Sequence, residues 1–91
     1  MTENKVRQHI IFHGCVQGVG FRYRSYYIAQ SLSLTGWVKN NWDGCVEMEI
    51  QGRREDIEEM LIRLGQQNYV EIEHMDIKSI PLETEGSFHI R

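Results

Sequence analysis

A glycine-rich stretch that ends in an arginine is the part of this chain best suited to chemistry. Residues 14–22 read GCVQGVGFR and join an apolar run to a run with helical periodicity. Glycines let successive backbone N–H groups converge on one point, and the unpaired amides at the start of the following helix add positive potential. Arg22 falls in the first turn of that helix, where its planar guanidinium could hold two phosphate oxygens at once. The stretch predicts a phosphate-binding loop; a plain strand-to-helix turn with a solvated arginine is the alternative.

Two common nucleotide-binding motifs do not fit this loop. The dinucleotide-binding fingerprint G-x-G-x-x-G requires a further glycine after Gly18 and Gly20, at the position that Tyr23 occupies. The P-loop motif requires a Lys-Ser or Lys-Thr pair after its glycines, and no such pair follows any glycine of the chain. A nucleotide cofactor is therefore not expected.

A second polar group lies in residues 36–47, which read GWVKNNWDGCVE. Asp-Gly within this stretch supplies the positive φ values of a tight turn between two strand-like runs. In a split β-α-β topology the end of the first of these runs can lie at the same rim as the glycine loop, so Asn40 could face Arg22. Its carboxamide can hold a water in line with a bound phosphorus without carrying charge. Consecutive strand side chains point to opposite faces, so only one of Asn40 and Asn41 can be aimed at the loop.

The periodicity of the apolar residues predicts the elements that hold these groups in place. It indicates helices over residues 21–32 and 57–64, and strands over 6–12, 35–41, 45–51, from 70 onward with a bulge near His74, and 88–90. Two helices packed on one face of an antiparallel sheet is the α+β solution for this order, a ferredoxin-like βαββαβ sandwich with a short C-terminal strand. At 91 residues the chain is too short for a second core, so residues 1–91 are expected to form a single domain.

Composition excludes several classes of partner. The net charge is −3, and Lys and Arg are scattered instead of forming the basic stripe that nucleic acid requires. No apolar run approaches the roughly 18 residues needed to span a bilayer, and the first residues contain no signal-peptide segment. We therefore expect a cytoplasmic monomer without nucleic-acid or membrane partners.

The cysteines and histidines do not form a recognisable metal motif. Cys15 and Cys45 are too few for a disulfide scaffold or a zinc ribbon, and we expect free thiols, with a bridge between them as the alternative. His13 and Cys15 would share one face of a strand, but two ligands do not make a closed metal site. We predict no metal site, and the histidines are interpreted as ordinary strand residues.

Both stretches resemble motifs of the acylphosphatase family. The first family motif, G-x-V-Q-G-V-x-F-R, is matched by residues 14–22, and the second, G-W-V-x-N-x-x-D-G-x-V-E, by residues 36–47. The resemblance implies that Arg22 is the phosphate-binding arginine and Asn40 the water-orienting asparagine. It assigns the phosphate cradle to the backbone of Cys15, Val16, Gln17, Gly18, Val19, Gly20 and Phe21. Family members often carry Gly-Pro between the second helix and the next strand, where this chain has residues 65–69 without proline.

The resemblance also implies a reaction, the hydrolysis of a small-molecule acyl phosphate to a carboxylate and inorganic phosphate. An acyl phosphate already has a good leaving group, so its hydrolysis needs phosphate placement and a positioned water more than a strong base or a covalent nucleophile. Backbone amides and Arg22 would stabilise the charge on the phosphoryl oxygens, so no metal or other cofactor is expected. The sequence does not identify the acyl group: the resemblance implies small-molecule carboxyl phosphates and phosphorylated acidic side chains as candidates, and the sequence does not rank them.

Two other functions are open at this level. Cys15 could be the nucleophile of a phosphatase with a covalent intermediate, but such enzymes resemble one another in a C-x5-R loop, whereas six residues separate Cys15 from Arg22. The chain could also be a non-catalytic anion-binding regulatory module on the same fold, with an aromatic contact surface formed by Tyr23, Tyr26, Tyr27 and Trp42.

Overall fold

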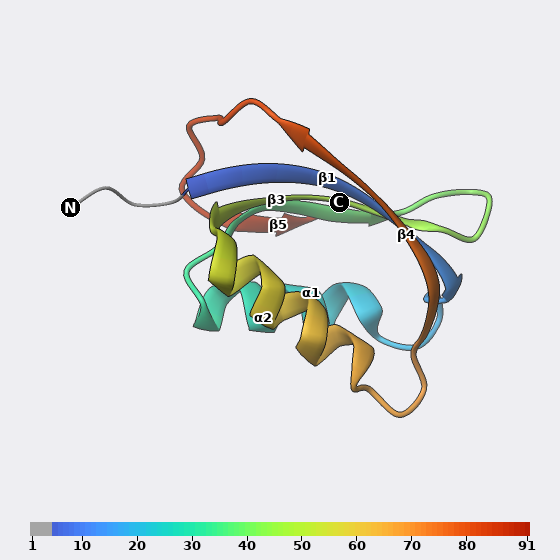
Figure 1. The fold of residues 1–91 in the computed structure, drawn as a ribbon. Helices are drawn as coiled ribbons and strands as arrows, with labels where there is room; N and C mark the ends of the chain where they lie inside the picture. The colour runs from blue at the N-terminus through green and yellow to red at the C-terminus, as the bar shows by residue number, and fades with distance from the viewer. Residues whose placement is uncertain (1–4) are drawn as a thin grey trace.

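Two helices cover one face of a five-stranded sheet in the computed structural model, which describes residues 5–91 (Figure 1). The elements in chain order are β1 (Lys5–Cys15), α1 (Phe21–Ser31), β2 (Thr35–Asn40), β3 (Val46–Arg53), α2 (Arg54–Gly65), β4 (Glu71–Ile80) and β5 (Phe88–Ile90). This order and layering confirm the predicted α+β, ferredoxin-like βαββαβ sandwich.

The strands lie side by side in the order β4-β1-β3-β2-β5. β1 pairs antiparallel with β3 and β4, and β2 pairs antiparallel with β3, as predicted for the hairpin. The short β5 pairs parallel with β2, which the prediction of an antiparallel sheet did not include. Its direction follows from the path of the chain: β4 and β5 lie on opposite edges, and a chain that returns across the sheet from the end of β4 enters the far edge in the direction of β2.

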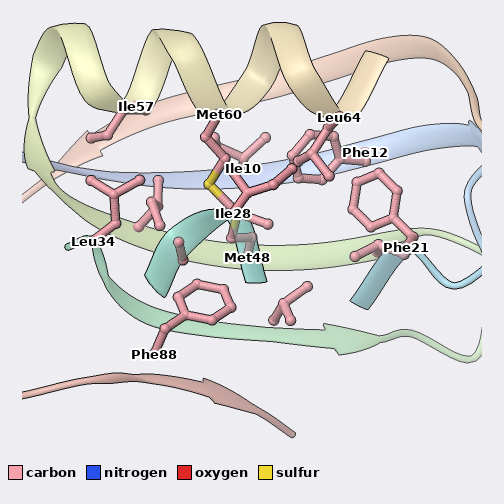
Figure 2. Packing of buried hydrophobic residues seen from close by; sticks show 14 of the residues in the cluster. Ile10, Phe12, Phe21, Ile28, Leu34, Met48, Ile57, Met60, Leu64 and Phe88 are labelled. Carbon is pink, nitrogen blue, oxygen red and sulfur yellow. The ribbon is translucent and has the colours of Figure 1, made fainter. Parts of the chain in front are cut away.

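Alternation along the strands and helical spacing along α2 direct one set of side chains into a single core. Ile10 and Phe12 of β1 face the helices, as do Met48 and its neighbours at i ± 2 in β3, and all of them are completely buried (Figure 2). The ring centroids of Phe12 and Phe21 lie 5.0 Å apart in an edge-to-face contact. Because Phe12 lies near the end of β1 and Phe21 begins α1, this contact anchors both sides of the glycine loop to the core.

The predicted bulge in the fourth strand is present. His13 pairs with His74, but the next residue of β1, Gly14, pairs with Ile72, so Glu73 is an extra residue in β4. A bulge bends the strand and increases its local twist. The bend therefore falls where β1 leads into the glycine loop.

A buried cation ties the connection between β4 and β5 to the sheet. The guanidinium of Arg7 donates to Glu49 Oε1 at 2.8 Å and to Glu85 Oε1 at 2.8 Å, and it lies 3.7 Å from Glu83 Oε1. Gln51 Nε2 also donates to the backbone oxygen of Glu83 at 2.8 Å. The side chain of Arg7 has no exposed surface, so its charge depends on these partners.

We expect Arg7→Met to lower the free energy of unfolding by about 2–3 kcal/mol, because the substitution leaves several acidic side chains without their shared cation. Urea titration followed by circular dichroism measures this change. Arg63→Met is the matched control: the Arg63 side chain is exposed, pairs with Glu59 at i,i+4 and makes a long contact of 3.5 Å with Ser31 Oγ, so its loss should cost less than about 1 kcal/mol. Equal losses in the two variants would contradict a special role for the buried cation.

Candidate active site

Three connections meet at one end of the molecule: the loop 16–20, the β2–β3 turn 41–45 and the α2–β4 connection 66–70 (Figure 1). A pocket of about 120 Å³ lies at this end. Its lining is formed by Val16, Gly18, Gly20, Phe21, Arg22, Tyr23 and Asn40. The structure therefore brings Arg22 and Asn40 to one pocket, together with part of the loop that the sequence predicted to bind phosphate.

The glycines of the loop are required by the path of the backbone. Gly18 and Gly20 have φ angles of 74° and 77°, in the left-handed region, and a Cβ atom on either would have nothing within 4 Å. Strain in the backbone, and not crowding, therefore selects glycine at these positions. Gly20 is also the N-cap residue of α1, so the loop delivers the start of a helix to the pocket.

The start of α1 is open to an anion. No side chain caps it, and its first turn contains no acidic residue. The first amides of a helix have no partner within the helix and carry a partial positive charge. Both features leave positive potential at the pocket without a competing carboxylate in the same turn.

Arg22 is half-buried in the first turn of α1. Within residues 5–91, its guanidinium has no hydrogen-bond or ion-pair partner, in contrast to that of Arg7. Arg24 lines a different pocket, of about 140 Å³, together with Val19 and Tyr69. The two arginines of the first helical turn therefore line different pockets.

Asn40 and Asn41 have different surroundings, as strand alternation predicts. Asn40, the last residue of β2, lines the pocket. The side chain of Asn41 instead interacts with the Glu47 carboxyl, on the face of the sheet away from the helices. Hydrogen bonds from His9 and from Asn41 hold the pKa of the Glu47 carboxyl below its usual range. Asn40, and not Asn41, is therefore the carboxamide available to a ligand in the pocket.

The two cysteines are free thiols, so the alternative of a bridge between them is not adopted. Cys15 is exposed and is not among the residues that line the pocket. Cys45 is buried beside His13, with 3.2 Å between Sγ and Nδ1, and burial raises the pKa of its thiol. Among the residues that the structure describes, no three His, Cys, Asp or Glu side chains are grouped as metal ligands, and no helix is long and apolar enough to cross a membrane.

Sequence reasoning missed the contacts of one side chain in the loop. Only the backbone of Gln17 was assigned a role, but its Nε2 donates to the carbonyl oxygens of Asn41 and Cys45, at 2.7 and 2.8 Å. The signal in the sequence was the long carboxamide side chain of Gln17 among glycines and valines. A loop that needed only flexibility would not require such a side chain. The partners of that carboxamide lie 24 and 28 residues along the chain, and local patterns do not reveal them.

Comparisons with known proteins cover nearly the whole chain. The family model described as acylphosphatase matches residues 8–90. An acylphosphatase of Bifidobacterium longum is 38% identical over 93 residues, which cover 99% of this chain and 96% of the relative. The structure is similar to that of an acylphosphatase from Coxiella burnetii, with a TM-score of 0.88 at 32% identity over 97% of this chain and 94% of the other. An acylphosphatase structure from Bacillus subtilis gives the same TM-score of 0.88 at 31% identity, over 94% and 98% of the two chains.

Glu47 lies in β3 close to the β2–β3 turn, and its hydrogen bonds should make the free energy of unfolding depend on pH. Because folding lowers its pKa, its contribution is full above the ordinary value of 4.5 and is lost as the pH falls through the lower value of the folded state. We expect Glu47→Gln to reduce the free energy of unfolding by about 1 kcal/mol at neutral pH, and the difference from the parent to shrink below about pH 4. Urea titrations of both proteins across this range test the expectation.

Glu58→Gln is the control for this measurement. Glu58 is exposed on α2, so its substitution removes one carboxylate charge at a site away from Glu47. A Glu47→Gln difference that stays constant from neutral to acid pH would show that the ionised carboxylate is not the stabilising species.

Proposed function

Because the chain belongs to the acylphosphatase family, we propose that its pocket hydrolyses the carboxyl–phosphate bond of acyl phosphates to a carboxylate and inorganic phosphate. Arg22 and the loop amides hold the phosphoryl group, and Asn40 orients the attacking water. The observation that carries this proposal is the meeting of an unpaired guanidinium and a carboxamide in one pocket beside an uncapped helix start.

The binding step in this proposal uses backbone N–H donors of the loop. Backbone amides of Cys15, Val16, Gln17, Gly18, Val19, Gly20 and Phe21 form the cradle, and the first turn of α1 adds its unpaired amides. Arg22 closes the cradle with a fixed fork of N–H donors, which fits phosphate oxygens better than a lysine would. These groups are in place before substrate arrives, so they stabilise the charge of the transition state without reorganising.

The chemical step needs an oriented water as nucleophile, and it needs neither a strong general acid nor a metal. In phosphoryl transfer the attacking and leaving oxygens lie roughly in line, with negative charge spread over the equatorial oxygens. The Asn40 carboxamide can accept a hydrogen bond from the water and hold it on the side opposite the leaving group. The leaving carboxylate is a weak base, so its departure needs no strong general acid. Arg22 and the amides supply the positive charge, and the reaction proceeds without a metal or another cofactor.

The substrate is a small-molecule acyl phosphate. The pocket holds about 120 Å³, which suits a phosphoryl group, and we propose that the protein acts as a monomer. The acyl group extends away from the cradle, and nothing in the pocket lining selects one acyl group.

Removing either polar group should abolish most of the activity. We expect Arg22→Ala and Asn40→Ala each to lower turnover by at least about 10²-fold, the scale of a single lost electrostatic donor. Release of inorganic phosphate from acetyl or benzoyl phosphate measures turnover. Asn41→Ala is the matched control for Asn40→Ala, since its side chain faces Glu47, and it should stay within about fivefold of the parent. Near-normal turnover of folded Asn40→Ala would defeat the assignment of the water-orienting residue.

Catalysis should survive the removal of divalent metals. We expect turnover in excess EDTA to equal turnover without it, because the charge on the phosphoryl oxygens is met by Arg22 and backbone amides. A loss of activity in EDTA that added Mg²⁺ restores would contradict the metal-free mechanism. Binding of phosphate without any turnover of either acyl phosphate would favour the alternative, a non-catalytic anion-binding module.

A further inference from the structure

The two halves of the pocket come from segments that are not neighbours in the sheet. The loop and Arg22 follow β1, whereas Asn40 ends β2, and β3 lies between these two strands. Adjacent strands are about 4.8 Å apart, so the ends of β1 and β2 are separated by roughly 10 Å across the sheet. A contact that spans β3 is therefore needed to set the distance from the loop to Asn40.

The side chain of Gln17 makes such a contact. Its Nε2 donates one hydrogen bond of 2.7 Å to the carbonyl oxygen of Asn41 and another of 2.8 Å to that of Cys45. Asn41 directly follows Asn40, and Cys45 directly precedes β3. One amide group, with both of its protons engaged, thus fastens the loop to the two sides of the β2–β3 turn.

The turn itself is closed by other bonds. The amide of Asn41 donates to the Cys45 carbonyl at 2.9 Å, and the amide of Gly44 donates to the Asn41 carbonyl at 3.2 Å. The amide of Cys45 donates to Asp43 Oδ1 at 3.0 Å. Each carbonyl that Gln17 contacts therefore already accepts a hydrogen bond within the turn. It follows that the turn can form without Gln17, and that the added bonds connect the turn to the loop.

We propose that Gln17 is a positioning residue that fixes Asn40 at the correct distance from the bound phosphoryl group. This inference rests on the proposed function, in which Asn40 orients the attacking water. The donors for phosphate all belong to residues 15–22, on one side of the contact, and Asn40 lies on the other side. Loss of the Gln17 side chain should therefore impair attack by water and leave phosphate binding intact.

Glutamine fits this role through both its length and its two donors. Methionine has a similar length but no N–H group, so it fills the space without making the contact. Glutamate would bring a carboxylate against two carbonyl oxygens, and asparagine is one methylene shorter. These differences provide a graded set of variants at a single position.

We expect Gln17→Met to lower kcat by about 10- to 100-fold, because displacing a reacting group by about 1 Å costs on that order. KM for acetyl phosphate and the inhibition constant of inorganic phosphate should stay within about twofold of the parent. Gln30→Met is the matched control: Gln30 is exposed on α1 and its side chain donates only to Tyr26, so its kcat should equal that of the parent. Gln17→Met with parental kcat, or with raised KM at unchanged kcat, would overturn the inference.

A double-mutant cycle tests whether Gln17 acts through Asn40. In the Asn40→Ala background, Gln17→Met should lower kcat by less than about threefold, since the group that it positions is already absent. Full additivity of the two losses would overturn the proposal. Circular dichroism and thermal unfolding establish that each variant is folded at the assay temperature; if Gln17→Met is not folded, Gln17→Asn replaces it with the same expectations.

The same data separate this inference from the proposed function. A parent protein without turnover, or Asn40→Ala with parental turnover, would defeat the proposed function itself. Parental kcat in Gln17→Met alongside a strong defect in Asn40→Ala would defeat only the positioning role.

Discussion

The proposed site depends on a positive centre, Arg22 and the start of α1, that has no negatively charged partner among residues 5–91. The chain has a net charge of −3, and the buried guanidinium of Arg7 is held by Glu49 and Glu85. At the start of α1 the opposite arrangement holds, because the first turn has no acidic residue and no capping side chain. Arg7 fastens a connection, whereas Arg22 and the helix start are the groups that we propose bind the anionic substrate. The two arginines have the same chemistry, and their surroundings decide which is structural.

The fold keeps this centre in place through contacts on both sides of the loop. The Phe12–Phe21 contact fixes the loop ends to the core, and the φ angles of Gly18 and Gly20 define the path between them. The helix start is therefore set by packing, and a cap would place a polar side chain where the ligand belongs. The uncapped helix is a local loss of stability that suits an anion site, since a bound anion satisfies the same amides.

Much of this could be read from the sequence because local periodicity encodes it. A period of two predicts that Asn40 and Asn41 face opposite ways, and helical spacing separates Arg22 from Arg24. The change of phase in the fourth strand predicted its bulge, although not the pairing of Gly14 with Ile72. The features that sequence reasoning missed all depend on distant partners: the parallel pairing of β5 with β2, the burial of Arg7, and the two bonds of Gln17. Arg7 reads as an ordinary polar position in an alternating strand, and only the fold shows the acidic residues around it.

Separating the binding donors from the water-orienting group has a consequence for catalysis. In the mechanism that we propose, the amides of the loop and Arg22 contact the phosphoryl group in substrate, transition state and product alike, so part of their binding energy also holds inorganic phosphate. Interactions accelerate a reaction only to the extent that they are stronger in the transition state than in the ground state. In the same proposal Asn40 acts on the water and not on the phosphate, so its contribution would appear chiefly in the step of attack. If Gln17 positions Asn40 as we propose, the rate of attack depends on the link from loop to turn, whereas the affinity for the product depends on the loop and Arg22.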